Sequence, residues 1–247
     1  MKTKTLLMLC CLLVSICFAQ ATDMEECFAL NEYFNKPVPE VHQKIAEYQN
    51  RLKTDKSDYY AHLAIAILYS ALSSPMENPE EGASEKIVEH SKAFEKKEKN
   101  NVLAMTYYGL GCSLVSRDSR NPFTQLSMVK RAIRTFDTAV EISDGHDLQW
   151  FVRYMRGNFY INLPGSFKKR PAAEQDFEFI SSYYTAHPEI EGYMCNAYFY
   201  LGEIEKTRGN LETAVSFWKH SVSINERLAL NAREGEQSAE RLTVFAD

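Results

Sequence analysis

Apolar side chains recur every three to four residues along most of this chain. Between Ser57 and Ser73 they fall at Tyr60, Leu63, Ile67 and Leu68, and the spacing returns at Tyr107, Leu110 and Leu114. This spacing gathers apolar residues on one face of an α-helix, whereas a half-buried strand would alternate at every second residue. The pattern therefore predicts helices throughout and no strand.

A small residue recurs in these helices at a nearly constant interval. It is Ala64, Gly111, Gly157 and Gly202, with separations of 47, 46 and 45 residues. All except Gly157 directly follow a leucine that has a tyrosine three residues before it. Self-similarity at a period of this size predicts an array of helical repeats.

Turn-forming residues predict where the helices start and how they join. Asn78-Pro79 and Asn121-Pro122 each place a capping side chain before a proline, which suits a first helical turn. At the joint after residue 208, Gly209 can take a left-handed conformation and Asn210 can cap the next helix. We expect helices to begin at each of these places.

The segment Gly192–Arg227 resembles a tetratricopeptide repeat. The resemblance rests on Tyr198, Leu201 and Gly202 in a first helix, and on Ala214, Trp218 and Ser221 in a second. The second-helix signature recurs as Ala132-Phe136-Ala139 and Ala173-Phe177-Ile180, and more weakly at Ile87, Ser91 and Phe94. Small residues let the two helices approach closely while a large aromatic side chain fills the gap beside them.

The resemblance implies an all-α solenoid of antiparallel, tetratricopeptide-like helix pairs with right-handed superhelical stacking. We expect four pairs over residues 57–230, with N-terminal capping helices over 22–56 and a C-terminal capping helix or tail over 231–247. The period exceeds the family's ~34 residues. Nine extra residues separate the helices of the second pair, and Arg153 and Arg156 replace tyrosine and leucine in the third.

The N-terminus has the layout of a secretory signal peptide, which we place at residues 1–21. Lys2 and Lys4 precede an apolar stretch, Leu6–Phe18, that ends at Ala19-Gln20-Ala21. The stretch is short for a membrane-spanning helix, so a permanent anchor is the weaker alternative, and lipid anchoring is a minor one. We expect an exported protein, periplasmic or secreted. The absence of an Asn-X-Ser/Thr site favours bacterial export slightly.

Removal of that segment would leave a mildly acidic chain with three cysteines. A negative net charge disfavours nucleic acid as a partner. The cysteines are Cys27, Cys112 and Cys195, an odd and sparse set, so disulfides are not expected to be the main support of the fold. No linker-like composition divides the chain, so one continuous domain is expected.

In the tetratricopeptide family, ligands bind the concave face lined by the first helix of each pair. That resemblance, carried over by register, places Tyr69, Tyr108, Phe151, Tyr154, Asn158, Asn162, Asn196 and Phe199 in a binding groove. Tyrosine offers contact area at low entropic cost, and an asparagine amide pairs with both N–H and C=O of an extended backbone. The alternative is that the aromatics are core residues and the asparagines bond to solvent or helix ends.

A basic cluster offers a second candidate site. Arg153, Arg156, Lys168, Lys169 and Arg170 surround a Pro-Gly turn that could hold a phosphate or carboxylate. The alternative is surface pairing with Glu174, Asp176 or Glu178, which is common and contributes little.

The six histidines show no metal-ligand spacing, and no catalytic motif or cofactor-binding loop is found. We therefore expect a non-catalytic scaffold, without cofactor or metal, that binds a protein or peptide. The alternative is an accessory protein that binds a small molecule or anion, for example one associated with a transporter, and an enzyme ranks third.

Overall fold

All regular elements in the computed structural model are helices. It describes residues 25–73, 79–230 and 232–245. The elements are η1 (Leu30–Asn35), α2 (Val38–Thr54), α3 (Tyr59–Ser73), α4 (Ala83–Glu95), α5 (Val102–Asp118), α6 (Pro122–Ile142), α7 (Gln149–Ile161), η2 (Gly165–Phe167), α8 (Arg170–Tyr184), η3 (Pro188–Ile190), α9 (Glu191–Arg208), α10 (Leu211–Arg227) and α11 (Arg233–Val244). The predicted all-α class is confirmed, and no described helix is long and apolar enough to cross a bilayer. The predicted signal peptide lies outside the described residues.

The contacts divide the chain into two compact units, and the boundary in the sequence lies between residues 135 and 136, inside α6. Unit 1 covers residues up to Thr135, and unit 2 begins at Phe136. The sequence predicted one continuous array. Because the contacts divide the chain into two units, each unit is described by itself.

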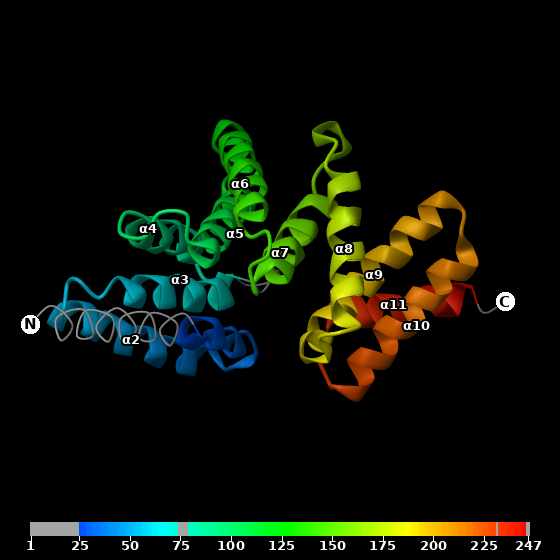
Figure 1. The fold of residues 1–247 in the computed structure, drawn as a ribbon, viewed down its shortest axis with the longest axis horizontal. Helices are drawn as coiled ribbons and strands as arrows, with labels where there is room; N and C mark the ends of the chain where they lie inside the picture. Colours follow the sequence, from blue (N-terminus) through cyan, green and yellow to red (C-terminus); the bar gives the residue numbers. More distant parts are fainter. Residues whose placement is uncertain (1–24, 74–78, 231, 246–247) are drawn as a thin grey trace, which may run out of the picture. The chain divides into compact units, whose positions relative to one another are not determined.

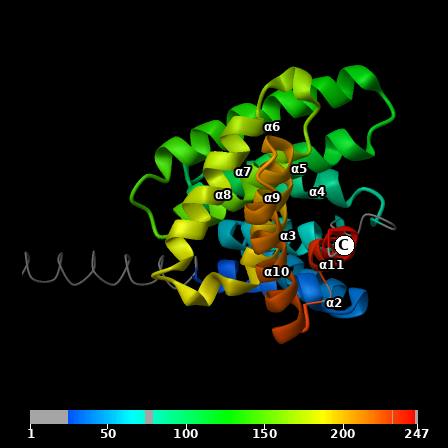
Figure 2. The ribbon, with the colours of Figure 1, turned by 90° about the vertical axis from the view of Figure 1, so that its right-hand side faces the viewer.

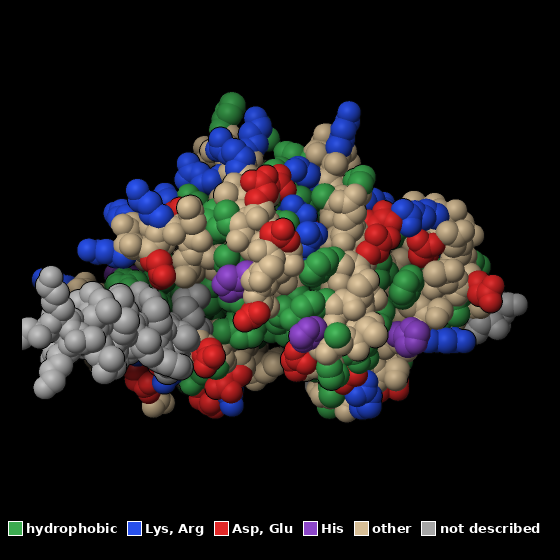
Figure 3. Space-filling view, viewed as in Figure 1, with side chains coloured by type: hydrophobic (Ala, Val, Ile, Leu, Met, Phe, Trp, Pro, Cys, Tyr) green, Lys and Arg blue, Asp and Glu red, His purple; other side chains and the backbone are tan. Residues whose placement is uncertain are grey.

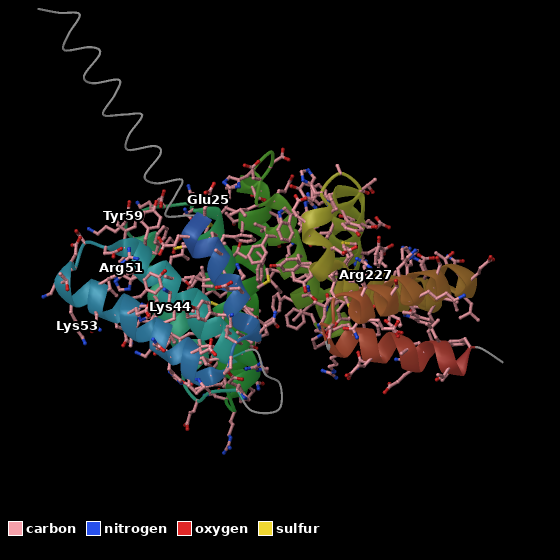
Figure 4. The ribbon with its side chains drawn as sticks, turned by 90° about the horizontal axis from the view of Figure 1, so that it is seen from below. Glu25, Lys44, Arg51, Lys53, Tyr59 and Arg227 are labelled. Carbon is pink, nitrogen blue, oxygen red and sulfur yellow. The ribbon has the colours of Figure 1, made fainter. Side chains whose placement is uncertain are left out.

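In unit 1, α2 packs against α3, α3 against α4 and α4 against α5 (Figure 1). The helix α3 is buried almost all round, because α2 and α4 both pack on it and its own sequence is nearly all apolar. Arg51, in the last turn of α2 (labelled in Figure 4), donates from Nε to Asp58 Oδ2, just before α3, at 2.8 Å. The amphipathic helix α2 thus covers one side of the apolar helix α3.

Unit 2 contains two helix pairs, α7 with α8 and α9 with α10, and α11 packs on the second pair (Figures 1 and 2). Phe199 of α9 and Ala214 and Trp218 of α10 form a buried cluster. Leu242 and Phe245, at the C-terminal end of the chain, pack against this cluster. The C-terminal helix therefore covers apolar surface that α9 and α10 would otherwise expose.

Glycine permits a close crossing in each helix pair of unit 2. A Cβ atom placed on Gly202 would lie 2.4 Å from Trp218 Nε1, and one on Gly157 would lie 3.2 Å from the Phe177 ring. Both glycines face the aromatic residue that the sequence signature placed opposite them. Gly111 differs, because a Cβ there would lie 2.9 Å from Ile87 of the preceding helix α4. It permits a close approach of α5 to α4.

Of the three predicted helix starts, the one at Asn121 is confirmed, and the other two differ from the prediction. Asn121 Oδ1 accepts from the backbone N–H of Phe123 at 2.9 Å, as predicted for the start of α6. The helix α4 begins at Ala83, after Gly82 takes a left-handed φ of 78°, and so does not begin at Pro79; Asn78 lies outside the described residues. Asn210 precedes α10 beside left-handed Gly209, but its amide bonds Glu205 instead of capping the helix.

The nine extra residues of the second pair do not form a long loop. Only three residues separate α5 from α6, because α6 extends over 21 residues. The longer period in this region is therefore taken up by added helical turns.

We predict that Gly202→Ala lowers the free energy of unfolding by about 1–3 kcal/mol, because the new methyl group overlaps the buried Trp218 indole. Urea unfolding of the chain at neutral pH measures the change. Gly192→Ala is the matched control in the same helix. No atom lies within 4 Å of a Cβ there, so this change should raise stability by up to about 1 kcal/mol. Equal effects of the two substitutions would contradict the crossing as the cause.

Candidate functional site

The structure distributes the predicted groove residues over both units. Tyr69 lies on α3 and Tyr108 on α5, both half-buried in unit 1. Tyr69 lies 6.4 Å from the His90 ring, and Tyr108 accepts from Arg131 at 3.4 Å. The other six belong to unit 2, where Phe151, Tyr154 and Asn158 lie on α7, Asn162 directly follows its C-terminus, and Asn196 and Phe199 lie on α9. Unit 2 therefore holds the larger set.

Two of the six are core residues. Phe151 is 2% exposed and packs against Trp150 and Tyr193, and Phe199 is 5% exposed in the cluster with Trp218. The alternative considered from the sequence, that aromatics at helical spacing serve the core, describes both. Their rings stabilise unit 2 and do not form a binding surface in this conformation.

The other four lie on facing rows of α7 and α9. The rings of Tyr154 and Tyr193 are 5.0 Å apart and nearly perpendicular, and Asn162 Nδ2 lies 3.4 Å from Tyr200 Oη. The contacts occur in the same order along both helices, so the rows run parallel. We call them the tyrosine–asparagine face, which comprises Tyr154, Asn158 and Asn162 from α7 and Tyr193, Asn196 and Tyr200 from α9.

The three asparagines of this face differ in their bonding. Asn158 and Asn162 each donate from Nδ2 to the backbone carbonyl one turn earlier, at 2.8 Å. Asn196 is half-buried on α9, and its Oδ1 is buried with no hydrogen-bond partner among the described residues. A buried acceptor without a donor is uncommon in a native fold, because it loses water without compensation.

The tyrosine hydroxyls of the face stay protonated at neutral pH. Burial raises the pKa of Tyr154, Tyr193 and Tyr200. The carboxylate of Glu234 on α11 raises the pKa of Tyr154 and Tyr200 further. Each hydroxyl can therefore donate a hydrogen bond as well as accept one.

The arginines of the basic cluster are paired with buried acid. Asp176 of α8 is 0% exposed and accepts from Arg156 Nε and Nη2 at 2.8 Å and from Arg153 Nη1 at 3.1 Å. Arg156 Nη1 and Lys169 Nζ reach Asp137 of α6 at 3.1 and 2.8 Å. Two carboxylates therefore already neutralise most of the positive charge of these three side chains.

Burial and charge act in opposite directions on the two acids. Burial raises the pKa of Asp176, although Arg156 and Arg153 oppose the shift. Burial also acts against ionisation of Asp137, but hydrogen bonds from Lys169 and Tyr160 outweigh it and lower its pKa. Lys168 and Arg170 lie outside the network: both are exposed, and Arg170 bonds Thr207 at 3.1 Å.

Tyr193, Tyr200 and Asp137 were not selected from the sequence, and Asp176 was named only as a surface partner of the basic cluster. Tyr193 and Tyr200 lie three residues before and four residues after Asn196, a spacing that puts all three on one helix face. Asp137 directly follows Phe136, and Asp176 directly precedes Phe177. An acid beside the aromatic residue of a helix crossing is the signal that could have identified both.

A histidine pair links α3 to α4 in unit 1. The Nδ1 atoms of His62 and His90 are 2.9 Å apart. One ring must therefore be neutral, with an unprotonated Nδ1 that accepts a hydrogen bond from the Nδ1–H of the other ring. Burial and His62 lower the pKa of His90 to about 4, and Lys86 acts the same way while Glu89 opposes it. Burial also lowers the pKa of His62, against the carboxylates of Glu89 and Asp58.

We predict that Asp176→Asn lowers the free energy of unfolding by about 3 kcal/mol, because it removes the buried carboxylate that the partly buried guanidinium groups of Arg153 and Arg156 share. Urea unfolding measures the change. Glu174→Gln on the same helix removes the pair with Arg208, a half-exposed side chain, and should cost below about 1 kcal/mol. A larger loss in Glu174→Gln than in Asp176→Asn would show that the buried network is not required.

We predict that acidification destabilises the fold through the histidine pair. Unfolded histidine takes up its proton near pH 6.5, whereas folded His90 does so near 4, so stability is lost as the pH falls through this window. Because both rings are partly exposed, we expect His90 to account for about 1–2 kcal/mol. Urea unfolding of wild type and His90→Gln between pH 7.5 and 4.5 measures the difference. The variant should lose less stability than wild type, whereas exposed His220→Gln should follow wild type.

Neither a metal centre nor a known relative points to a function. The described residues contain no group of three or more His, Cys, Asp or Glu side chains that could hold a metal ion. The side chains of Cys27, Cys112 and Cys195 are buried. No family model, curated protein or solved structure matches this chain. The function is therefore argued from the tyrosine–asparagine face and its contacts.

Proposed function

We propose that the protein is an exported, non-catalytic scaffold with tetratricopeptide-like helix pairs that binds a protein partner through an extended peptide segment. The tyrosine–asparagine face of α7 and α9 is the proposed site. The observation that carries the proposal is the buried, unpartnered Oδ1 of Asn196 on this face. Because this oxygen is inaccessible in the unbound structure, the half-buried Asn196 side chain would rotate to expose it, and a backbone N–H of the bound peptide would then supply the missing donor.

The other residues of the face suit the same ligand. Tyr154 and Tyr193 provide broad, rigid contact area beside the amide, and their hydroxyls remain protonated donors. Because amides and hydroxyls pair with a peptide backbone whatever its side chains, they fix the direction and register of the ligand. Sequence preference would then depend on the aromatic contacts.

The length of the face indicates how much peptide it holds. From residue 154 to residue 162 the row on α7 rises about 12 Å, at about 1.5 Å per residue. An extended chain advances about 3.3 Å per residue, so about four residues of ligand match this length. A contact of this size is typical of a short recognition segment.

The signal-like sequence at residues 1–21 supports export. The anion-binding alternative has weaker support, because Arg153 and Arg156 already pair with Asp176. Further pairing with an external anion would require the buried acid to give up its partners.

We predict that selection from a random peptide library on phage yields ligands that bind the chain with micromolar affinity. Titration calorimetry compares wild type with the variant Asn196→Ala plus Tyr154→Ala. The variant should bind at least tenfold more weakly, because it loses the amide pair and one aromatic contact. Methylation of one backbone nitrogen of the peptide at a time should weaken binding at the position that meets Asn196.

Gln175→Ala, at an exposed position on α8, is the control and should bind like wild type. Circular dichroism checks that each variant is folded. Equal selection by wild type and the double variant, or binding that no backbone methylation affects, would refute peptide recognition at this face.

A further inference from the structure

Unit 1 carries a strongly basic region within an acidic chain. Residues 92–134 contain nine Lys and Arg but three Asp and Glu, a net formal charge of +6, whereas the whole chain has −5. Eight of the nine basic residues are exposed. In Figure 3, Lys and Arg side chains gather along the edge over α4 and α6.

These charges are not neutralised within the part of the chain that the structure describes. Arg117 forms an ion pair with Asp118, and among the described residues the other eight have no carboxylate within ion-pair distance. Lysines at 96, 97 and 99 follow the C-terminus of α4, where they complement the helix dipole. That explanation does not extend to Lys130 and Arg134, which lie well inside α6.

The exposed stripe of α6 joins this charge to apolar surface. Phe123 is 83% exposed in the first turn, and Leu126 is 45% exposed one turn later. Lys130 and Arg134 continue the same stripe at helical spacing, and residues 122–134 contain no acid. The side chain of Asn121 caps the helix at the backbone N–H of Phe123, which fixes the first turn that displays the ring.

We propose that this surface docks on an anionic lipid bilayer, with Phe123 and Leu126 inserted among the lipid headgroups and the basic residues on the phosphates. A helix face with aromatic and aliphatic side chains beside lysine and arginine is the pattern that binds at a membrane interface. Phe123 favours lipid over an acidic protein partner: its ring projects almost fully into solvent from a helix end, and a bilayer accepts such a ring without a matching pocket.

The proposal concerns residues of unit 1 and is independent of peptide binding in unit 2. Its geometry is that of a peripheral contact. The fourteen residues of α6 that belong to unit 1 extend about 21 Å, at about 1.5 Å per residue. Such a length can lie along a membrane surface with one end inserted. Attraction by several lysines and arginines is expected to weaken steeply as salt is raised.

The test is co-sedimentation of the chain from Thr22 onward with vesicles of pure phosphatidylcholine or with 30% phosphatidylglycerol. We expect binding to the anionic vesicles alone, reduced more than tenfold between 50 and 500 mM NaCl. Lys130→Gln with Arg134→Gln should weaken binding about tenfold to thirtyfold, from about fivefold per charge. Phe123→Ser should weaken it about tenfold at low salt.

Phe123→Trp gives a readout that does not depend on affinity. Its indole fluorescence should shift to the blue with anionic vesicles, while the native Trp150 and Trp218 are already buried and should change little. The matched control is Leu211→Ser with Lys219→Gln, exposed residues of α10 in unit 2, which should bind like wild type.

Several results would overturn the proposal. They are an absence of binding to anionic vesicles, equal binding to both vesicle types, and losses of equal size in the α6 and α10 variants. Salt-sensitive binding to polyglutamate or to DNA, unaffected by Phe123→Ser and without vesicle binding, would assign the basic surface to another class of partner.

Discussion

The close crossing of paired helices at a glycine is the constraint on which unit 2 depends. Gly202 lies so near the Trp218 indole that a methyl group would overlap it, and Trp218 is completely buried at this crossing. The large aromatic side chain fills the space beside the crossing, and the missing side chain of glycine lets the backbones meet over it. The position of α10 against α9 follows from this pair, and α11 then covers the same cluster.

The crossing of α7 with α8 also determines where charge can be buried. A Cβ on Gly157 would lie 3.3 Å from Asp176 Cβ, so the glycine brings the acid close to α7. Asp176 can then reach both Arg153 and Arg156 while it is shielded from water. Without so close an approach, the acid would stay in solvent and the arginines would be free to bind other anions. The glycine thus converts a basic sequence cluster into an internal ion-pair network.

The sequence could predict what depends on neighbours along one helix or on a repeated signature. It predicted the all-helical class, the Asn121 cap and the opposition of Gly202 to Trp218, because each follows from local spacing. It named Asp176 only as a surface partner of the basic cluster and missed that this acid is buried between Arg153 and Arg156, because burial depends on the angle and depth of a helix crossing. It placed the start of α4 at Pro79, where left-handed Gly82 determines the actual start. Phe151 and Phe199 show the same difficulty, since register alone cannot tell which flank of a helix is covered.

The basic residues of α7 in unit 2 are paired and partly buried, whereas those of residues 92–134 in unit 1 are mostly exposed. The difference follows from where the acidic residues lie. In unit 2, Asp137 and Asp176 are adjacent in sequence to the buried aromatic residues of α6 and α8. Both arginines of α7, Arg153 and Arg156, therefore have a carboxylate within ion-pair distance. In unit 1, the region 92–134 has few acids, and its Lys and Arg remain on the surface. Burying such charges without partners would cost several kcal/mol each. An arginine can therefore replace an apolar residue at a helix crossing when the facing helix supplies a carboxylate to pair with it. A basic segment that has no such carboxylate stays exposed to the solvent and its anions.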